Sequence, residues 1–174
     1  TGILVGSSDG VSISQTRVYG YTNGFGIRTW NSTNTTISGN DIYGNAEGVE
    51  LSGNATGNRV SGNTIHDNVT EIDWNDPTKG GGVGVAFMHS WGPATANGNK
   101  LWHNRAPLKD GTYDGSDFEI YGASDVTITW NELWDAEHAL ETGTDGPACN
   151  ILRFTNNTAY AASTQPGWAA GLLI

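Results

Sequence analysis

The chain has 174 residues and a formal net charge of −10, so it can hold one domain with a hydrophobic core and is a poor partner for nucleic acids or anionic membranes. Abundant Gly, Asn, Thr and Ser disfavour a helical protein, and seven Trp with many aliphatic residues disfavour disorder. Cys149 is the single cysteine, which excludes an internal disulfide, and no apolar run reaches the length of a membrane span. The composition is typical of a secreted bacterial protein. Without an initiator Met or a signal peptide, we expect a mature form or an excised piece.

A six-residue motif recurs along the chain with successive steps of 24, 23, 36, 32 and 26 residues. Its copies are ISQTRV, ISGNDI, VSGNTI, ANGNKL, ITWNEL and FTNNTA, starting at Ile13, Ile37, Val60, Ala96, Ile128 and Phe154. The fourth position holds Thr16, Asn40, Asn63, Asn99, Asn131 and Asn157, and the sixth holds Val18, Ile42, Ile65, Leu101, Leu133 and Ala159. Repeats of 20–50 residues are typical of solenoids.

Each motif lies next to a second short apolar segment of the kind expected for a strand. These segments lie at 26–28, 49–51, 83–87, 118–120, 140–142 and 172–174. Strand, turn, strand and turn make one coil of a parallel β-solenoid, whose coils stack at about 4.8 Å. The sequence therefore predicts an all-β solenoid of about six coils, as a single domain over residues 1–174. We expect the fourth-position residues to form a ladder in which side-chain amides of neighbouring coils bond to each other.

The pattern resembles the right-handed parallel β-helix repeats of the pectin-lyase-like superfamily over nearly the whole chain, most closely in SGNDIYGN, SGNTIHDN and NGNKLWHN. The resemblance implies a right-handed parallel β-helix and a polysaccharide or oligosaccharide partner, because the superfamily includes polysaccharide lyases, glycoside hydrolases, sugar epimerases, phage tailspikes and binding modules. The epimerases' YGFDPH-type signature is absent, and we place no counterpart of the lyases' Arg or Lys base. The chain stops in the apolar segment GLLI, so we expect it to be part of a longer solenoid, or to associate end to end through uncapped coils.

Two coils carry insertions at the same predicted corner, one of residues 69–81 and one of residues 105–116. Loops on one edge of a solenoid usually form its binding face. From these loops we select Trp74 and Tyr113 as substrate-binding residues. The alternative is that both loops are surface insertions without a function.

Two rows of side chains flank this corner. The residue after the sixth motif position would form a platform for sugar rings, or would only stabilise neighbouring coils by stacking; this row is Tyr19, Tyr43, His66, Trp102, Trp134 and Tyr160. One residue further on, Asp67, His103 and Asp135 fall in consecutive coils. These residues would form an oriented general base, half of a metal site, or a neutral polar stack. From these rows we select as substrate-binding residues Trp102, Trp134, His66 and His103.

A third row, on the second strand of each coil, holds Arg28, Glu50, Ala86 or Gly84, Glu119 and Glu141. Glu119 and Glu141 belong to adjacent coils, and like charges about one strand spacing apart raise the pKa of one carboxyl, which makes it a general acid. Asp117, two residues before Glu119, is expected on the same face. Because glycoside hydrolysis uses paired carboxyl groups, we predict Glu119, Glu141 and Asp117 as catalytic residues, with Glu50 and His138 binding the substrate.

The same carboxylates would alternatively bind calcium, which takes oxygen ligands, through Asp114, Asp117 and Asp145; no other cofactor is expected. They would otherwise form only a solvated acidic face. Three functions follow: a secreted polysaccharide-degrading enzyme, a carbohydrate-binding module, and a structural or adhesive solenoid. For the enzyme, a hydrolase is preferred to a lyase, because an acidic groove suits a neutral glycan better than a polyuronate.

Overall fold

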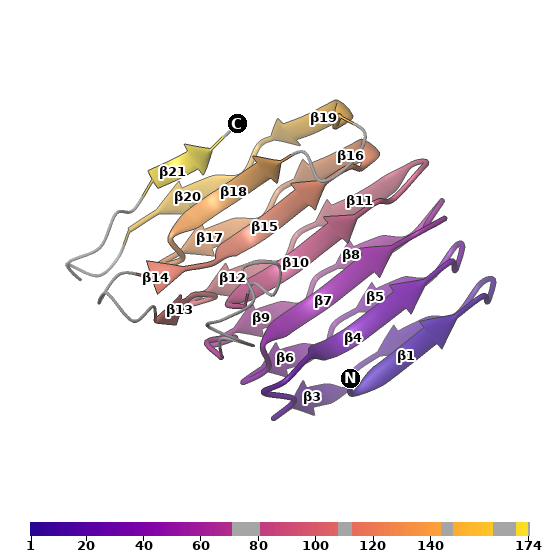
Figure 1. Ribbon diagram of the computed structural model, residues 1–174, viewed down its shortest axis with the longest axis horizontal. Helices are drawn as coiled ribbons and strands as arrows, with labels where there is room; N and C mark the ends of the chain where they lie inside the picture. Colours follow the sequence, from indigo (N-terminus) through magenta and orange to yellow (C-terminus); the bar gives the residue numbers. More distant parts are fainter. Residues whose placement is uncertain (71–80, 108–112, 144–147, 162–169, 174) are drawn as a thin grey trace.

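The computed structural model describes residues 1–70, 81–107, 113–143, 148–161 and 170–173, which form strands joined by short turns. Three parallel sheets run the length of the molecule, and the chain visits them in turn, so that one coil contributes one strand to each (Figure 1). This arrangement confirms the predicted all-β parallel β-helix of about six coils. Within the described residues, no helix is long and apolar enough to cross a membrane.

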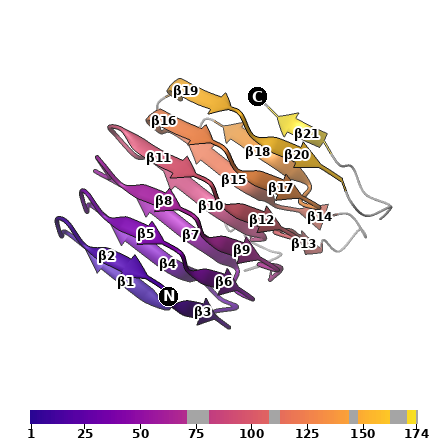
Figure 2. The same cartoon turned by 180° about the vertical axis from the view of Figure 1, so that it is seen from behind.

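Sheet 1 has seven strands: β1 (Ile3–Gly6), β4 (Phe25–Trp30), β7 (Glu47–Ser52), β10 (Val83–Met88), β15 (Ser116–Tyr121), β18 (His138–Gly143) and β21 (Ala170–Leu173). Sheet 2 has six: β2 (Ser12–Ser14), β5 (Thr36–Ser38), β8 (Arg59–Ser61), β11 (Ala94–Asn97), β16 (Ser124–Thr129) and β19 (Asn150–Thr155). Sheet 3 has six: β3 (Arg17–Tyr19), β6 (Asp41–Tyr43), β9 (Thr64–His66), β12 (Lys100–Trp102), β17 (Glu132–Trp134) and β20 (Thr158–Tyr160). Figure 2 shows sheets 2 and 3 from behind.

The motif copies align in register, which places their aliphatic residues in the core. The first position forms one continuous row across sheet 2, from Ile13 to Phe154. The sixth position forms another across sheet 3, from Val18 to Ala159. Facing residues of sheet 1, such as Phe87 and Phe118, complete a core that is fully buried in the middle coils.

The predicted asparagine ladder forms at the turn between sheets 2 and 3. We call Thr16, Asn40, Asn63, Asn99, Asn131 and Asn157 the first ladder. Each side-chain amide from Asn40 to Asn131 donates to the Oδ1 of the next ladder residue at 2.9–3.0 Å. The same Oδ1 accepts the backbone N–H of the preceding ladder residue. The preceding motif residue often is glycine because it adopts a positive φ, as Gly39, Gly62 and Gly98 do.

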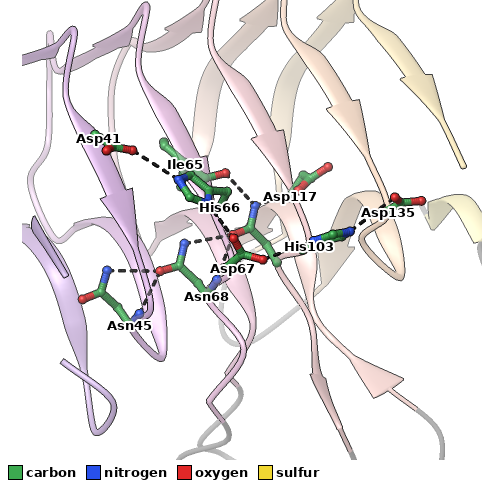
Figure 3. A network of polar contacts seen from close by, with 10 residues as sticks. Asp41, Asn45, Ile65, His66, Asp67, Asn68, His103, Asp117 and Asp135 are labelled. Carbon is green, nitrogen blue, oxygen red and sulfur yellow. Dashed lines mark hydrogen bonds and ion pairs between the residues drawn. The ribbon is translucent and has the colours of Figure 1, made fainter. Parts of the chain in front are cut away.

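A second ladder lies at the turn between sheets 3 and 1 and consists of Asn45, Asn68 and Asn104. Asn45 donates to Asn68 at 3.1 Å, and Asn68 donates to Asn104 at 2.9 Å (Figure 3). These residues are fully buried, so the amides satisfy backbone groups that the turn takes out of the sheets. This ladder was not predicted.

The two insertions leave at this same corner, as predicted, so far as their described ends show. A side chain at Gly82 would collide with the backbone of Arg105 and Ala106, and one at Gly115 would collide with the carbonyl oxygen of Gly82. The second insertion carries a short antiparallel hairpin, β13 (Ala106–Pro107) with β14 (Tyr113–Asp114). The two inserted loops therefore begin and end side by side.

Candidate active site

The outer face of sheet 1 gathers six carboxyl groups, which we call the acidic face: Glu47, Glu50, Asp114, Glu119, Glu137 and Glu141. Residues one coil apart share a position, so that Arg28, Glu50, Ala86, Glu119 and Glu141 form one row. Phe25, Glu47, Val83, Ser116 and His138 form a second row on the same strands. Asp114 comes from β14 and Glu137 from the turn before β18.

At the start of the strands of sheet 1, next to the turn from sheet 3, side chains do not alternate strictly between the inner and outer faces. In β7, a side chain at Gly48 would meet the buried side chains of Ile65 and Asn68, so this position faces the interior. The next residue, Val49, is fully buried as well. Two successive inward positions put Glu47 and Glu50 on the same outer face, although they are three residues apart.

Glu119 and Glu141 pair directly in adjacent strands, as predicted, but their surroundings differ. Glu141 accepts a hydrogen bond from the Ser116 hydroxyl at 2.9 Å on Oε2 and one from the Tyr121 hydroxyl on Oε1. Burial raises the pKa of Glu119 well above its usual range, and the nearby Glu141, Glu47 and Asp114 raise it further. The protonated form of Glu119 is thus favoured beside a carboxyl that two hydroxyl groups fix in place, which is the asymmetry expected of an acid and its partner.

Glu47 and Glu50 form the other end of the acidic face. The Arg28 Nε lies 2.7 Å from Glu50 Oε1, and Glu50 is almost completely buried. Burial raises the pKa of Glu47 to about 8, with a further contribution from Glu50 that Arg28 opposes. Arg28 itself lies over the ring of Phe25, 4.7 Å from its centroid.

The remaining acidic residues border Glu141. Burial and the neighbouring Asp114 and Glu141 raise the pKa of Glu137 to about 7. The pKa of Asp114 is also raised, by burial and by Glu141. His138 Nδ1 lies 3.7 Å from Glu141 Oε2, so of the predicted substrate-binding residues both His138 and Glu50 lie on this face.

Glu47, Glu137, Tyr121, Ser116 and Arg28 were not among the predicted site residues. Arg28 stood in the predicted row of Glu50, Glu119 and Glu141 but was not selected as a site residue. Glu47 holds the position in its coil that His138 holds in a later coil, so the alignment of coils could have led to its selection. Glu137 lies in a turn, where the repeat gives no signal. Tyr121 and Ser116 are identified only by their hydrogen bonds to Glu141.

The prediction that Asp117 shares the face of Glu119 is wrong. Asp117 is fully buried, and its Oδ1 accepts a hydrogen bond from Asn104 Nδ2 at 2.9 Å. It takes the inward position that Gly84 holds in the preceding coil. The register of sheet 3 puts Ala136 where the next asparagine of the second ladder would stand, so Asp117 provides the acceptor that Ala136 lacks (Figure 3).

This placement also separates two of the three predicted calcium ligands. Asp114 lies on the acidic face and Asp117 in the interior, while Asp145 lies outside the described residues. In the part of the chain that the structure describes, no three His, Cys, Asp or Glu side chains are grouped so that they could hold a metal ion. Calcium binding stays a prediction.

The row of rings on sheet 3 is a continuous stack. Ring centroids of successive members, from Tyr19 to Tyr160, lie 4.3–5.8 Å apart with planes within 14° of parallel. His66, Trp102 and Trp134 therefore contact neighbouring rings on both faces, which leaves their edges for any ligand. They lie on sheet 3, whereas Glu119 and Glu141 lie on sheet 1.

The predicted row of Asp67, His103 and Asp135 also forms. His103 Nδ1 lies 3.1 Å from Asp67 Oδ1, and His103 Nε2 lies 3.4 Å from Asp135 Oδ2. The other oxygen of Asp67 lies 2.6 Å from His66 Nδ1, which extends the chain of contacts to Asp41 (Figure 3). All three residues of the row have positive φ, where earlier coils have Gly20 and Gly44.

Of the two aromatic residues predicted in the inserted loops, the structure describes Tyr113. The Arg105 guanidinium carbon lies over the ring of Tyr113, 4.6 Å from its centroid, at the base of the second insertion. Trp74 lies outside the described residues.

Comparison with known proteins extends these findings. The family model of the right-handed β-helix region matches residues 1–117. No curated protein matches the sequence. Among solved structures, a DFA-IIIase mutant from Arthrobacter chlorophenolicus A6 superposes with a TM-score of 0.55 over 85% of this chain at 14% sequence identity. The aligned part spans 29% of that enzyme's chain, and the likeness shows the fold alone.

Proposed function

The chain belongs to the right-handed β-helix family, and on that basis we propose that it acts on a carbohydrate, by glycoside hydrolysis at the acidic face. The observation that supports this most directly is the pair of Glu119 and Glu141, which adjoin in register but differ in environment. The superposed DFA-IIIase is an enzyme of the same fold, which agrees with a catalytic role but does not identify a substrate.

In the proposed reaction, Glu119 is the general acid. Its pKa is raised by burial and by neighbouring carboxyl groups, so it keeps a proton to donate to the leaving oxygen of the glycosidic bond. Glu141 is the second carboxyl, acting on the anomeric carbon directly or through a water molecule. The hydroxyl groups of Ser116 and Tyr121 orient it, as preorganised catalysis requires.

The acidic face selects against acidic glycans. Four further carboxyl groups share the acidic face with Glu119 and Glu141, and Arg28 is already paired with Glu50 at 2.7 Å. A polyuronate would therefore meet carboxyl groups that cannot neutralise its charge, whereas a neutral glycan would present hydroxyl groups that hydrogen-bond to them. We propose a neutral polysaccharide or oligosaccharide as the substrate, outside the cell.

The test is to incubate the protein with a panel of neutral and acidic polysaccharides, with and without EDTA. Retention on insoluble glycans and released reducing ends are measured in the same samples. We expect release from a neutral glycan, lost by about 10³-fold or more in Glu119→Gln and in Glu141→Gln. Glu132→Gln, on sheet 3, is the matched control and should leave the rate unchanged.

Other results would replace the proposal. Retention without release in the parent protein would identify a carbohydrate-binding module. Release that both Gln variants retain would place catalysis elsewhere. If neither retention nor release occurs with any glycan, a structural solenoid becomes the better interpretation. EDTA sensitivity would show that a metal ion is required.

A further inference from the structure

A pocket opens where the second ladder ends, on the opposite side of β15 from Glu119. It has a volume of about 190 Å³, which is room for roughly six water molecules at about 30 Å³ each. Its walls come from β15, β17, the turn that follows β17, β18 and β20. The polar and aromatic lining consists of Asp117, Trp134, Asp135, Glu137 and Tyr160.

Changes to the repeat create this space. The earlier coils fill the corner with asparagine, but here Ala136 replaces the next asparagine of the second ladder. At the sixth motif position, the last coil has the small Ala159, where the earlier coils have Leu133 and other larger aliphatic residues. Ala139 and Ala161 complete the apolar lining. The pocket therefore results from four small residues in neighbouring coils, all placed around Asp117.

Asp117 gives the pocket a polar group without a partner. Its side chain is fully buried, Oδ1 is bonded to Asn104, and Oδ2 has no hydrogen-bond partner. A buried polar atom left in this way destabilises the protein, and a ligand that hydrogen-bonds to it would remove that cost. Figure 3 shows Asp117 on the side of the network that faces Asp135.

The lining indicates a neutral ligand with hydroxyl groups. Burial raises the pKa of Asp117 well above its usual range, and Asp135 raises it further, against the hydrogen bond from Asn104. A protonated Asp117 would donate from Oδ2, while Asp135 and Glu137 offer acceptors. A hydroxyl group both accepts and donates, and Trp134 with the alanines offers apolar contact to the carbon atoms of a ring.

We propose that this pocket binds one sugar ring, with Asp117 Oδ2 bonded to one of its hydroxyl groups. The choice of a sugar rests on the proposed function, but the pocket is separate from the Glu119 and Glu141 pair. It would anchor one unit of a glycan next to the acidic face, since Glu137 belongs to both.

The test uses saturation-transfer NMR with D-glucose, D-galactose, D-xylose and D-fructose on the whole chain. Ala161→Trp, at an exposed position of the pocket wall, should fill the pocket and reduce the signal of the bound sugar at least about tenfold. Ala148→Trp, at an exposed position on the way to sheet 2, is the control and should keep it. Asp117→Asn retains a donor in place of Oδ2 and should also keep binding.

The inference is overturned if no sugar gives a signal that Ala161→Trp removes, or if small amines such as ethanolamine bind there in preference to sugars. Folding of each variant is checked by its urea midpoint. Because the readout is binding of a single sugar, its failure leaves hydrolysis by Glu119 and Glu141 untouched, and the loss of hydrolysis in their Gln variants leaves this pocket untouched.

Discussion

Replacement of Asn99 by alanine tests whether the first ladder holds the coils together. Asn99 is fully buried in the middle of the ladder. Its Oδ1 accepts from the backbone N–H and the side-chain amide of Asn63 at 2.9 and 3.0 Å. Its Nδ2 donates to Val60 O at 3.0 Å and to Asn131 Oδ1 at 2.9 Å.

The substitution removes these four hydrogen bonds. At about 0.5–1.5 kcal/mol each, their loss lowers the free energy of unfolding by about 2–6 kcal/mol. The upper part of this range is expected, because Asn63 and Val60 are buried and the change leaves the N–H of one and the carbonyl of the other without their present partner. A loss of that size is a large fraction of the total stability of an ordinary domain.

The assay is urea unfolding followed by tryptophan fluorescence and circular dichroism, with linear extrapolation to water. Asn157→Ala is the matched control. Asn157 accepts the same two bonds from Asn131 and donates to Ile128 O, but it is partly exposed, so water replaces the lost partners and the cost should be less than half. Equal losses in both variants, or a loss under about 1 kcal/mol for Asn99→Ala, would refute the reasoning.

Three further predictions concern the acidic face and the ring stack. Between pH 4.5 and about 8 the folded protein holds more protons on Glu47 than the unfolded chain does, so stability should be highest at the acid end and fall as the pH rises; Glu47→Gln should flatten this dependence in thermal melts across that range. Tyr121→Phe removes one of two hydroxyl groups that donate to Glu141 and should lower kcat about 10- to 100-fold, with only a small decrease in the urea midpoint because Tyr121 is partly exposed. Trp102→Ala breaks two ring contacts, of 4.3 and 4.7 Å, and should destabilise by about 2–4 kcal/mol and reduce the near-ultraviolet circular dichroism. If it instead abolishes glycan retention at full stability, the row is a ligand platform.

Sequence reasoning succeeded where one coil constrains the next. The motif positions of Ile37, Asn40 and Ile42 recur at the same spacing in every coil, and hydrogen bonding between coils requires that register. The pairing of Glu119 with Glu141 follows from the same rule. A repeat therefore predicts which residues become neighbours, even when they are far apart in the chain.

Sequence reasoning failed at the corner between sheets 3 and 1, where successive side chains do not alternate strictly between the inner and outer faces of the sheet. Asp117 was assigned by counting two residues back from Glu119, but Asp117 and Phe118 are both buried in succession, because β15 enters the sheet from the turn with two inward positions. The second ladder was missed although SGNDIYGN, SGNTIHDN and NGNKLWHN end in Asn45, Asn68 and Asn104. The asparagine that ends each of these segments was the sequence signal for the second ladder.

At the corner between sheets 3 and 1, a coil can contain extra residues without a change in how the coils stack. Asn40 and Asn63 are 23 residues apart and Asn63 and Asn99 are 36 apart, yet both pairs of amides meet at 3.0 Å. A coil can thus gain about a dozen residues without disturbing the coils above and below it. This makes the corner a place where loops can be exchanged, in evolution and in protein engineering, while the ladders preserve the stacking of the coils.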